Sequence, residues 1–277
     1  MIQLPQALSM GAVTLKVADL DRMLRYYTEG VGLKVLDSSV NGYALGEDEP
    51  VLFLEHSPNL RQAGEHEAGL FHTAFLFKSE ASLAFAVASV ASKYQGSFTG
   101  SADHLVSKAF YFDDPEGNGV ELYWDRPRDQ WQWQNGEVKM ATLALDPNRF
   151  LADHLEGANH EVSSIGHVHL SVGSIEQAKD FYVNTLGFDI TTNYANTALF
   201  VAAGGYHHHM AMNIWRSRGA GRRQPTLGLG EVRIELGSQE VFAELDGYLK
   251  DSKAKFSNDG KSIEIFDPWG NQVSIRA

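Results

Sequence analysis

The sequence predicts an α+β fold made of four βαβββ units, numbered here as modules 1 to 4, in two homologous domains. The first observation is a repeat: GAVTLKVADLDRMLRYYTEGVGL at residues 11–33 aligns without a gap with GHVHLSVGSIEQAKDFYVNTLGF at residues 166–188. The second is a shared turn, DPEGN at residues 114–118 and DPWGN at residues 267–271, at nearly the same offset. The third is an alternating strand at the start of each copy, VTLKV or VHLSV, followed by a helix.

Length and composition agree with two domains. The chain has 277 residues, 43% of them hydrophobic, which is enough for two buried cores. We expect domains at residues 8–125 and 163–277, joined by a linker at residues 126–162. The linker contains two prolines and a short helix near NRFLADHLE.

Charge and cysteine content exclude several classes of function. The formal net charge is -12, so binding to nucleic acid or to an anionic membrane is disfavoured. The sequence has no apolar run near the ~20 residues that span a bilayer, and no secretory signal, so a cytoplasmic protein is expected. Because cysteine is absent, any metal site must use nitrogen and oxygen ligands.

Modules 1 and 3 each begin with a strand and a capped helix. Asp19 and Ser174 can cap the helix N-termini, and a left-handed glycine, Gly32 or Gly187, can end each helix. Short strands follow: VLFLEH in module 1, then ALFVAA and HHHMAMNIW in module 3.

Modules 2 and 4 follow the same order. Their opening strands are FHTAFLF and EVRIEL, and their helices are SLAFAVASVASKY and QEVFAELDGYLKD. Each ends with a strand, the DPxGN turn and a last strand.

Several histidines and one glutamate lie within the apolar strands predicted above. His72 lies in an apolar opening strand, and Glu121 lies between Val120 and Leu122. A buried carboxylate needs a partner such as a cation, but Glu121 could also lie on a solvated face, and His72 could be a hydrogen-bonded core residue. His167 and His169 share one strand face.

The HHH run at residues 207–209 leads into an apolar strand. There His207 and His209 would share a face. A solvated loop end is the alternative for this run.

The four modules, FY-x3-LGF and the DPxGN turns resemble the vicinal-oxygen-chelate superfamily, which contains glyoxalases, bleomycin-resistance proteins and extradiol dioxygenases. The resemblance covers both domains. HVHLSV, GGYHHHMAMNIW and DHLVSKAFYFDDPEGNGVELY are similar to two-domain catechol 2,3-dioxygenase-like proteins.

The resemblance implies a metal site formed by modules 2 and 3. The family's ligand positions align with His72, Glu121 and His167, the two-histidine, one-carboxylate set of non-haem Fe(II) enzymes. Fe(II) is therefore the expected cofactor, with Mn(II) as the alternative. Modules 1 and 4 have Ala12, Glu231 and Ser274 at the corresponding positions, and His169 is expected to support the site or the core.

The resemblance also implies catalytic side chains. Tyr111 lies ten residues before Glu121, where extradiol enzymes carry a tyrosine. Their acid–base histidine matches the HHH run, with His209 as first choice and His207 as second. His104 lies near a further active-site histidine of the family, at a spacing that departs by about two residues.

The implied activity is extradiol cleavage of an aromatic diol by dioxygen, in a protein that could form a homo-oligomer. Two alternatives stay open: a glyoxalase-like metal-dependent isomerase or lyase, and a non-catalytic binding protein of the same fold. The sequence does not identify the diol.

Overall fold

The computed structural model describes residues 2–159 and 161–277. These form two compact units. Unit A comprises Leu15–Asn59 and His72–Gly166, and unit B comprises Met1–Thr14, Leu60–Phe71 and His167–Ala277. The strands β1 (Ser9–Val17), β5 (Gly69–Phe77) and β12 (Val162–Ser171) contain residues of both units.

In unit A, module 1 places a short helix before three antiparallel strands. Asp19 accepts a hydrogen bond from the Arg22 N–H and begins helix α1. Gly32, with φ of 98°, ends the helical segment as expected. The elements are α1 (Leu20–Arg25), the π-helical turn η1 (Tyr26–Val31), β2 (Lys34–Ser39), β3 (Gly42–Gly46) and β4 (Pro50–His56).

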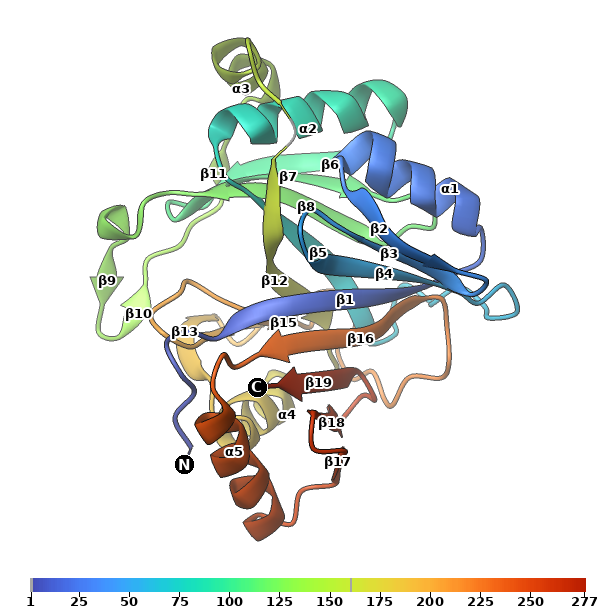
Figure 1. The fold of residues 1–277 in the computed structure, drawn as a ribbon. Coiled ribbons are helices and arrows are strands. Elements are labelled where there is room, and N and C mark those ends of the chain that lie inside the picture. The colour runs from blue at the N-terminus through green and yellow to red at the C-terminus, as the bar shows by residue number, and fades with distance from the viewer. Residues whose placement is uncertain (1, 160) are drawn as a thin grey trace. The chain divides into compact units, whose positions relative to one another are not determined.

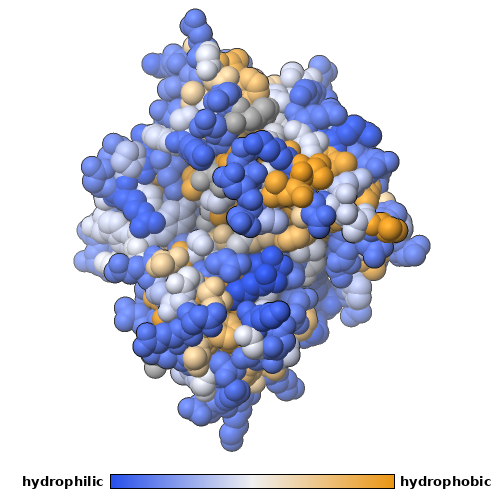
Figure 2. All heavy atoms as spheres, in the orientation of Figure 1, coloured by the Kyte–Doolittle hydropathy of each residue, from blue (hydrophilic) through white to orange (hydrophobic). Residues whose placement is uncertain are grey.

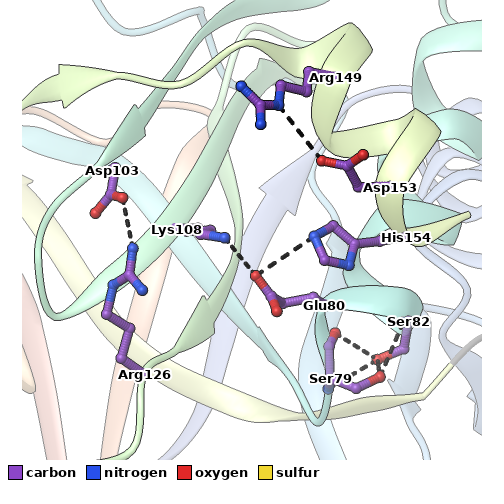
Figure 3. Close-up of polar contacts among 9 residues, drawn as sticks. All are labelled: Ser79, Glu80, Ser82, Asp103, Lys108, Arg126, Arg149, Asp153 and His154. Carbon is purple, nitrogen blue, oxygen red and sulfur yellow. Dashed lines mark hydrogen bonds and ion pairs between the residues drawn. The ribbon is translucent and has the colours of Figure 1, made fainter. Parts of the chain in front are cut away.

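Module 2 supplies the strands that carry two predicted metal ligands. β5 pairs in parallel with β8, and β8, β7 and β6 continue antiparallel. A capping box between Ser79 and Ser82 begins helix α2, as Figure 3 shows. The elements after β5 are α2 (Glu80–Lys93), β6 (Phe98–Asp103), β7 (Ser107–Asp113) and β8 (Gly119–Asp125).

The described residues of the linker belong to unit A. Its strand β11 pairs antiparallel with β6, and its helix α3 lies beside α2 (Figure 1). This helix matches the one expected near NRFLADHLE. The linker elements are η2 (Arg128–Gln130), β9 (Trp133–Gln134), β10 (Glu137–Val138), β11 (Leu143–Ala144) and α3 (Pro147–His154).

In unit B, module 3 follows the plan of module 1, with Ser174 as the helix N-cap. β15 pairs in parallel with β12 and antiparallel with β14, which pairs with β13. The elements after β12 are α4 (Ile175–Lys179), the π-helical turn η3 (Asp180–Thr185), β13 (Asp189–Tyr194), β14 (Ala198–Ala202) and β15 (Met210–Asn213).

Module 4 follows the plan of module 2. β16 pairs in parallel with β19, and β19, β18 and β17 continue antiparallel. The elements are β16 (Gly228–Glu235), α5 (Gln239–Asp251), β17 (Phe256–Asn258), β18 (Ser262–Phe266) and β19 (Gln272–Arg276). The observed order confirms the predicted α+β fold of two homologous domains.

Each DPxGN turn is anchored by a buried aspartate. Asp114 accepts hydrogen bonds from the N–H groups of Glu116 and Asn118 and, at 2.9 Å, from the Tyr27 hydroxyl. Burial raises the pKa of Asp114 to about 6, although these hydrogen bonds act in the opposite direction. Asp267 has the same role in unit B, where Tyr182 is its hydroxyl donor at 3.2 Å.

The face drawn in Figure 2 is mostly hydrophilic, with apolar patches between the polar side chains. No helix in the described part of the chain combines the length and the apolar character that crossing a bilayer requires.

Candidate metal centre

His72 and Glu121 come from adjacent parallel strands, β5 and β8. His72 is 6% exposed and Glu121 is 2% exposed, so Glu121 does not lie on a solvated face. The His72 Nε2 and Glu121 Oε2 atoms lie 2.9 Å apart. The flanking Val120 and Leu122 are also buried, so both faces of β8 are covered.

His167, on β12, is the third predicted ligand and is 2% exposed. Among the residues that the structure describes, His72, Glu121 and His167 form a group that could hold a metal ion. Each offers one ligand atom, and these atoms lie within 4.8 Å of one another. Two imidazoles and a buried carboxylate suit a divalent metal, since a cation offsets the free-energy cost of burying the carboxylate charge.

Tyr111 lies directly opposite Glu121 in the antiparallel pairing of β7 with β8. Its ring centroid is 5.7 Å from that of His72. Burial raises the pKa of Tyr111 well above 10, and the charge of Glu121 and a hydrogen bond with it add to the rise. Tyr111 therefore keeps its hydroxyl hydrogen at neutral pH and can donate it.

His104 contacts Tyr111 rather than the group of three. Its Nε2 lies 2.7 Å from the Tyr111 hydroxyl oxygen, and its Nδ1 lies 2.7 Å from the Ala141 carbonyl oxygen. The irregular spacing noted in the sequence is accommodated by the turn between β6 and β7, where Leu105 has a φ of 70°.

The HHH run does not begin a strand, and that expectation is wrong. β15 starts at Met210, after a turn in which Gly204 and Gly205 both have positive φ. The rule that alternate residues share a face therefore does not apply to His207 and His209. The glycine pair was the sequence signal for this turn.

Within unit B, His208 lies closer to His167 than His207 does, and sequence reasoning did not single it out. Their ring centroids are 4.1 Å apart, against 6.0 Å between His167 and His207. The Nδ1 atoms of His207 and His208 are 2.7 Å apart. His209 instead accepts a hydrogen bond from the Ala203 N–H at Nδ1 and packs against the Tyr206 ring.

His169 is buried, and its ring contacts Asn213 and Phe71. Its Nε2 lies 3.0 Å from the Asn213 amide nitrogen, while the Asn213 oxygen accepts a bond from the Trp215 N–H. The ring also packs against Phe71, with centroids 4.9 Å apart. The role of His169 at the site stays a prediction.

The corresponding positions in modules 1 and 4 have different chemistry. Ala12 and Ser274 are buried, and Glu231 pairs with Arg233 at 3.6 Å. A guanidinium of the chain itself thus lies beside the carboxylate of module 4.

The chain thus combines repeated βαβββ modules with a buried two-histidine, one-carboxylate group that could hold a metal ion. The model of the Glyoxalase/Bleomycin resistance protein/Dioxygenase superfamily matches residues 9–122 and 164–233. The chain belongs to this superfamily.

Individual relatives agree with this membership. The chain is 35% identical to a catechol-2,3-dioxygenase of Bacillus subtilis (strain 168) over 268 residues, covering 94% of this chain and 93% of the relative. A putative dioxygenase structure from the same organism has a TM-score of 0.68 at 12% identity, covering 100% of this chain and 86% of that one. Glyoxalase I from Zea mays has a TM-score of 0.59 at 18% identity, covering 98% and 92%. The two structures share the fold.

Proposed function

We propose that the protein is an extradiol ring-cleaving dioxygenase that uses Fe(II) and dioxygen on a catechol-type aromatic diol, with Mn(II) as the alternative metal. The observation that carries the proposal is the buried group of His72, Glu121 and His167. Similarity to a relative named catechol-2,3-dioxygenase supports the same reaction.

His72, Glu121 and His167 would hold the metal through two ring nitrogens and one carboxylate oxygen. A metal with three protein ligands keeps open positions, where both oxygens of the diol and dioxygen can meet and exchange electrons. All three residues are at most 6% exposed, so they exclude bulk water from the reacting groups.

Residues near the metal ligands would accept and return the protons of the reaction. One histidine of the HHH run takes the second diol proton and later returns it. His209 was the first prediction and His207 the second, whereas the contact with His167 favours His208. Tyr111 stays protonated and hydrogen-bonds a substrate oxygen.

The test begins with anaerobic purification, metal analysis and Fe(II) loading, followed by a catechol assay for a yellow ring-fission product. The variants His72→Ala, Glu121→Ala and His167→Ala should lose bound iron and turnover while keeping the wild-type circular dichroism. His56→Ala, which changes an exposed histidine on β4, is the control and should keep both. Normal iron content in all three ligand variants would contradict the proposal.

The alternatives predict different results. A glyoxalase-like isomerase would place a carboxylate in the segment that carries the HHH run, but residues 206–215 contain none. Turnover of a thiol hemiacetal, with Fe(II)-loaded protein inert toward catechol, would favour the isomerase. Tight ligand binding without any turnover would favour a binding protein. A homo-oligomer stays a prediction that sedimentation velocity checks.

A further inference from the structure

The hydrogen bonds of His104 define which ring nitrogen carries its hydrogen. The Ala141 carbonyl oxygen can only accept, so the 2.7 Å contact requires a hydrogen on Nδ1 of His104. A neutral imidazole has only one N–H, so its Nε2 is an acceptor. The hydroxyl of Tyr111, 2.7 Å from Nε2, must then be the donor.

This choice matters because two acceptors lie beside one hydroxyl hydrogen. Tyr111 hydrogen-bonds with Glu121, and this bond contributes to its raised pKa. When the Tyr111 hydroxyl donates its hydrogen bond to Nε2 of His104, the Glu121 oxygens keep their lone pairs for a ligand. The Tyr111 oxygen also keeps its lone pairs and can accept a hydrogen bond from a substrate hydroxyl.

His104 lies in a turn that contacts from the linker hold in place. The ion pair of Asp103 with Arg126 is called the brace below. Asp103 accepts a hydrogen bond from the Leu105 N–H with one oxygen. Its other oxygen pairs at 2.6 Å with Arg126, as Figure 3 shows. The Arg126 N–H also donates to the Val106 carbonyl. The brace holds Leu105 in a left-handed conformation that a leucine adopts only at a cost in free energy.

The linker is itself anchored where it meets this turn. Leu143 and Ala144 of β11 pair with Asp103 and Ala102 of β6. The Ser101 hydroxyl donates to the Leu145 carbonyl at 2.7 Å, so the anchoring continues beyond β11. Because β11 follows Ala141 so closely, the pairing limits how far the carbonyl can move from His104.

We propose that the first part of the linker, residues 126–146, is a positioning element of the active site. The Ala141 carbonyl holds His104 as the Nδ1–H tautomer, and His104 thereby directs the hydroxyl hydrogen of Tyr111 away from Glu121. The catalytic consequence rests on the proposed function, but the tautomer itself does not.

The first experiment measures the tautomer by ¹⁵N NMR of the whole protein labelled in its histidine rings. The His104 signals are assigned by their loss in His104→Gln or, if that variant does not fold, by cross-peaks from the Nδ1 hydrogen to Ala141. We expect a protonated Nδ1 and an unprotonated Nε2. A hydrogen on Nε2 alone would overturn the proposal.

The second experiment loosens the brace. Arg126→Met removes the partner of Asp103 and should lower kcat for catechol by about tenfold, the scale typical of a lost supporting contact. Arg126→Lys should restore most of the rate. Lys108→Met is the matched control, since it removes a 2.5 Å ion pair with Glu80 of similar exposure from the same hairpin and leaves the pair of Asp103 with Arg126 in place (Figure 3).

A double-mutant comparison separates positioning from general destabilisation. If the brace acts through Tyr111, Arg126→Met should have no further effect on kcat in a Tyr111→Phe background. Equal losses in both backgrounds, or an equal loss in Lys108→Met, would overturn the proposal. Absence of catechol turnover in the wild type would contradict the proposed function, while the NMR experiment would still decide the tautomer.

Discussion

Replacing Tyr27 by phenylalanine should destabilise the protein more at pH 8 than at pH 5. Tyr27 donates to the Asp114 carboxylate at 2.9 Å, and Asp114 is only 4% exposed. Burial raises the folded-state pKa of Asp114 to about 6, above its ordinary 3.8. The stability that folding gains from the protonated form of Asp114 is therefore complete below pH ~4 and is lost as pH rises through about 6.

The loss of stability in Tyr27→Phe depends on whether the acceptor, Asp114, is charged. At pH 5 most of Asp114 is protonated, so the lost hydrogen bond joins neutral groups and costs about 1 kcal/mol. At pH 8 Asp114 is ionised, and the lost bond costs about 2 kcal/mol. The difference corresponds to a further rise of about 0.7 in the folded-state pKa, since one pKa unit is about 1.4 kcal/mol.

Urea denaturation followed by circular dichroism at both pH values measures these free energies of unfolding. Tyr194→Phe, at a side chain that is 61% exposed, is the control and should change neither value. An equal cost of Tyr27→Phe at pH 5 and pH 8 would show that the hydroxyl does not stabilise an ionised carboxylate.

Four further changes have defined outcomes. Chelation should lower the melting temperature of the metal-loaded wild type, by the linkage of binding to folding, but not that of Glu121→Gln. Gly166→Ala should cost about 3 kcal/mol in thermal or urea unfolding, because its Cβ would lie 1.6 Å from the buried Tyr123 hydroxyl. Gly247 lies in helix α5, and a Cβ added there would have no neighbouring atom within 4 Å. Gly247→Ala should therefore stabilise the protein by about 0.5–1 kcal/mol in the same assay. Ser79→Ala should cost about 1 kcal/mol, because it removes the cap of α2.

Sequence reasoning predicted the elements with strong periodic signals. The helix predicted as QEVFAELDGYLKD is α5, residue for residue, and the caps Asp19 and Ser174 are where the patterns put them. These features depend on neighbours along the chain, so a single sequence reveals them. The HHH run was different, because its conformation depends on a glycine turn rather than on the apolar strand that follows.

The network around Tyr111 shows what sequence could not reveal. The tyrosine was predicted from its spacing to Glu121, and that spacing reflects a two-stranded pairing. The partner of His104 is a backbone carbonyl in the linker, and a carbonyl belongs to every residue, so it leaves no signal in the side-chain pattern. Ring contacts such as that of His208 with His167 likewise depend on tertiary packing.

The π-helical turns are a local feature that the two domains share. A π turn holds one residue more than an α turn, and η1 and η3 lie at almost equivalent places in modules 1 and 3. The helices of modules 2 and 4, α2 and α5, are α-helical throughout their described lengths. The shared π turn agrees with the homology of the two domains, and the backbone geometry of this segment separates modules 1 and 3 from modules 2 and 4.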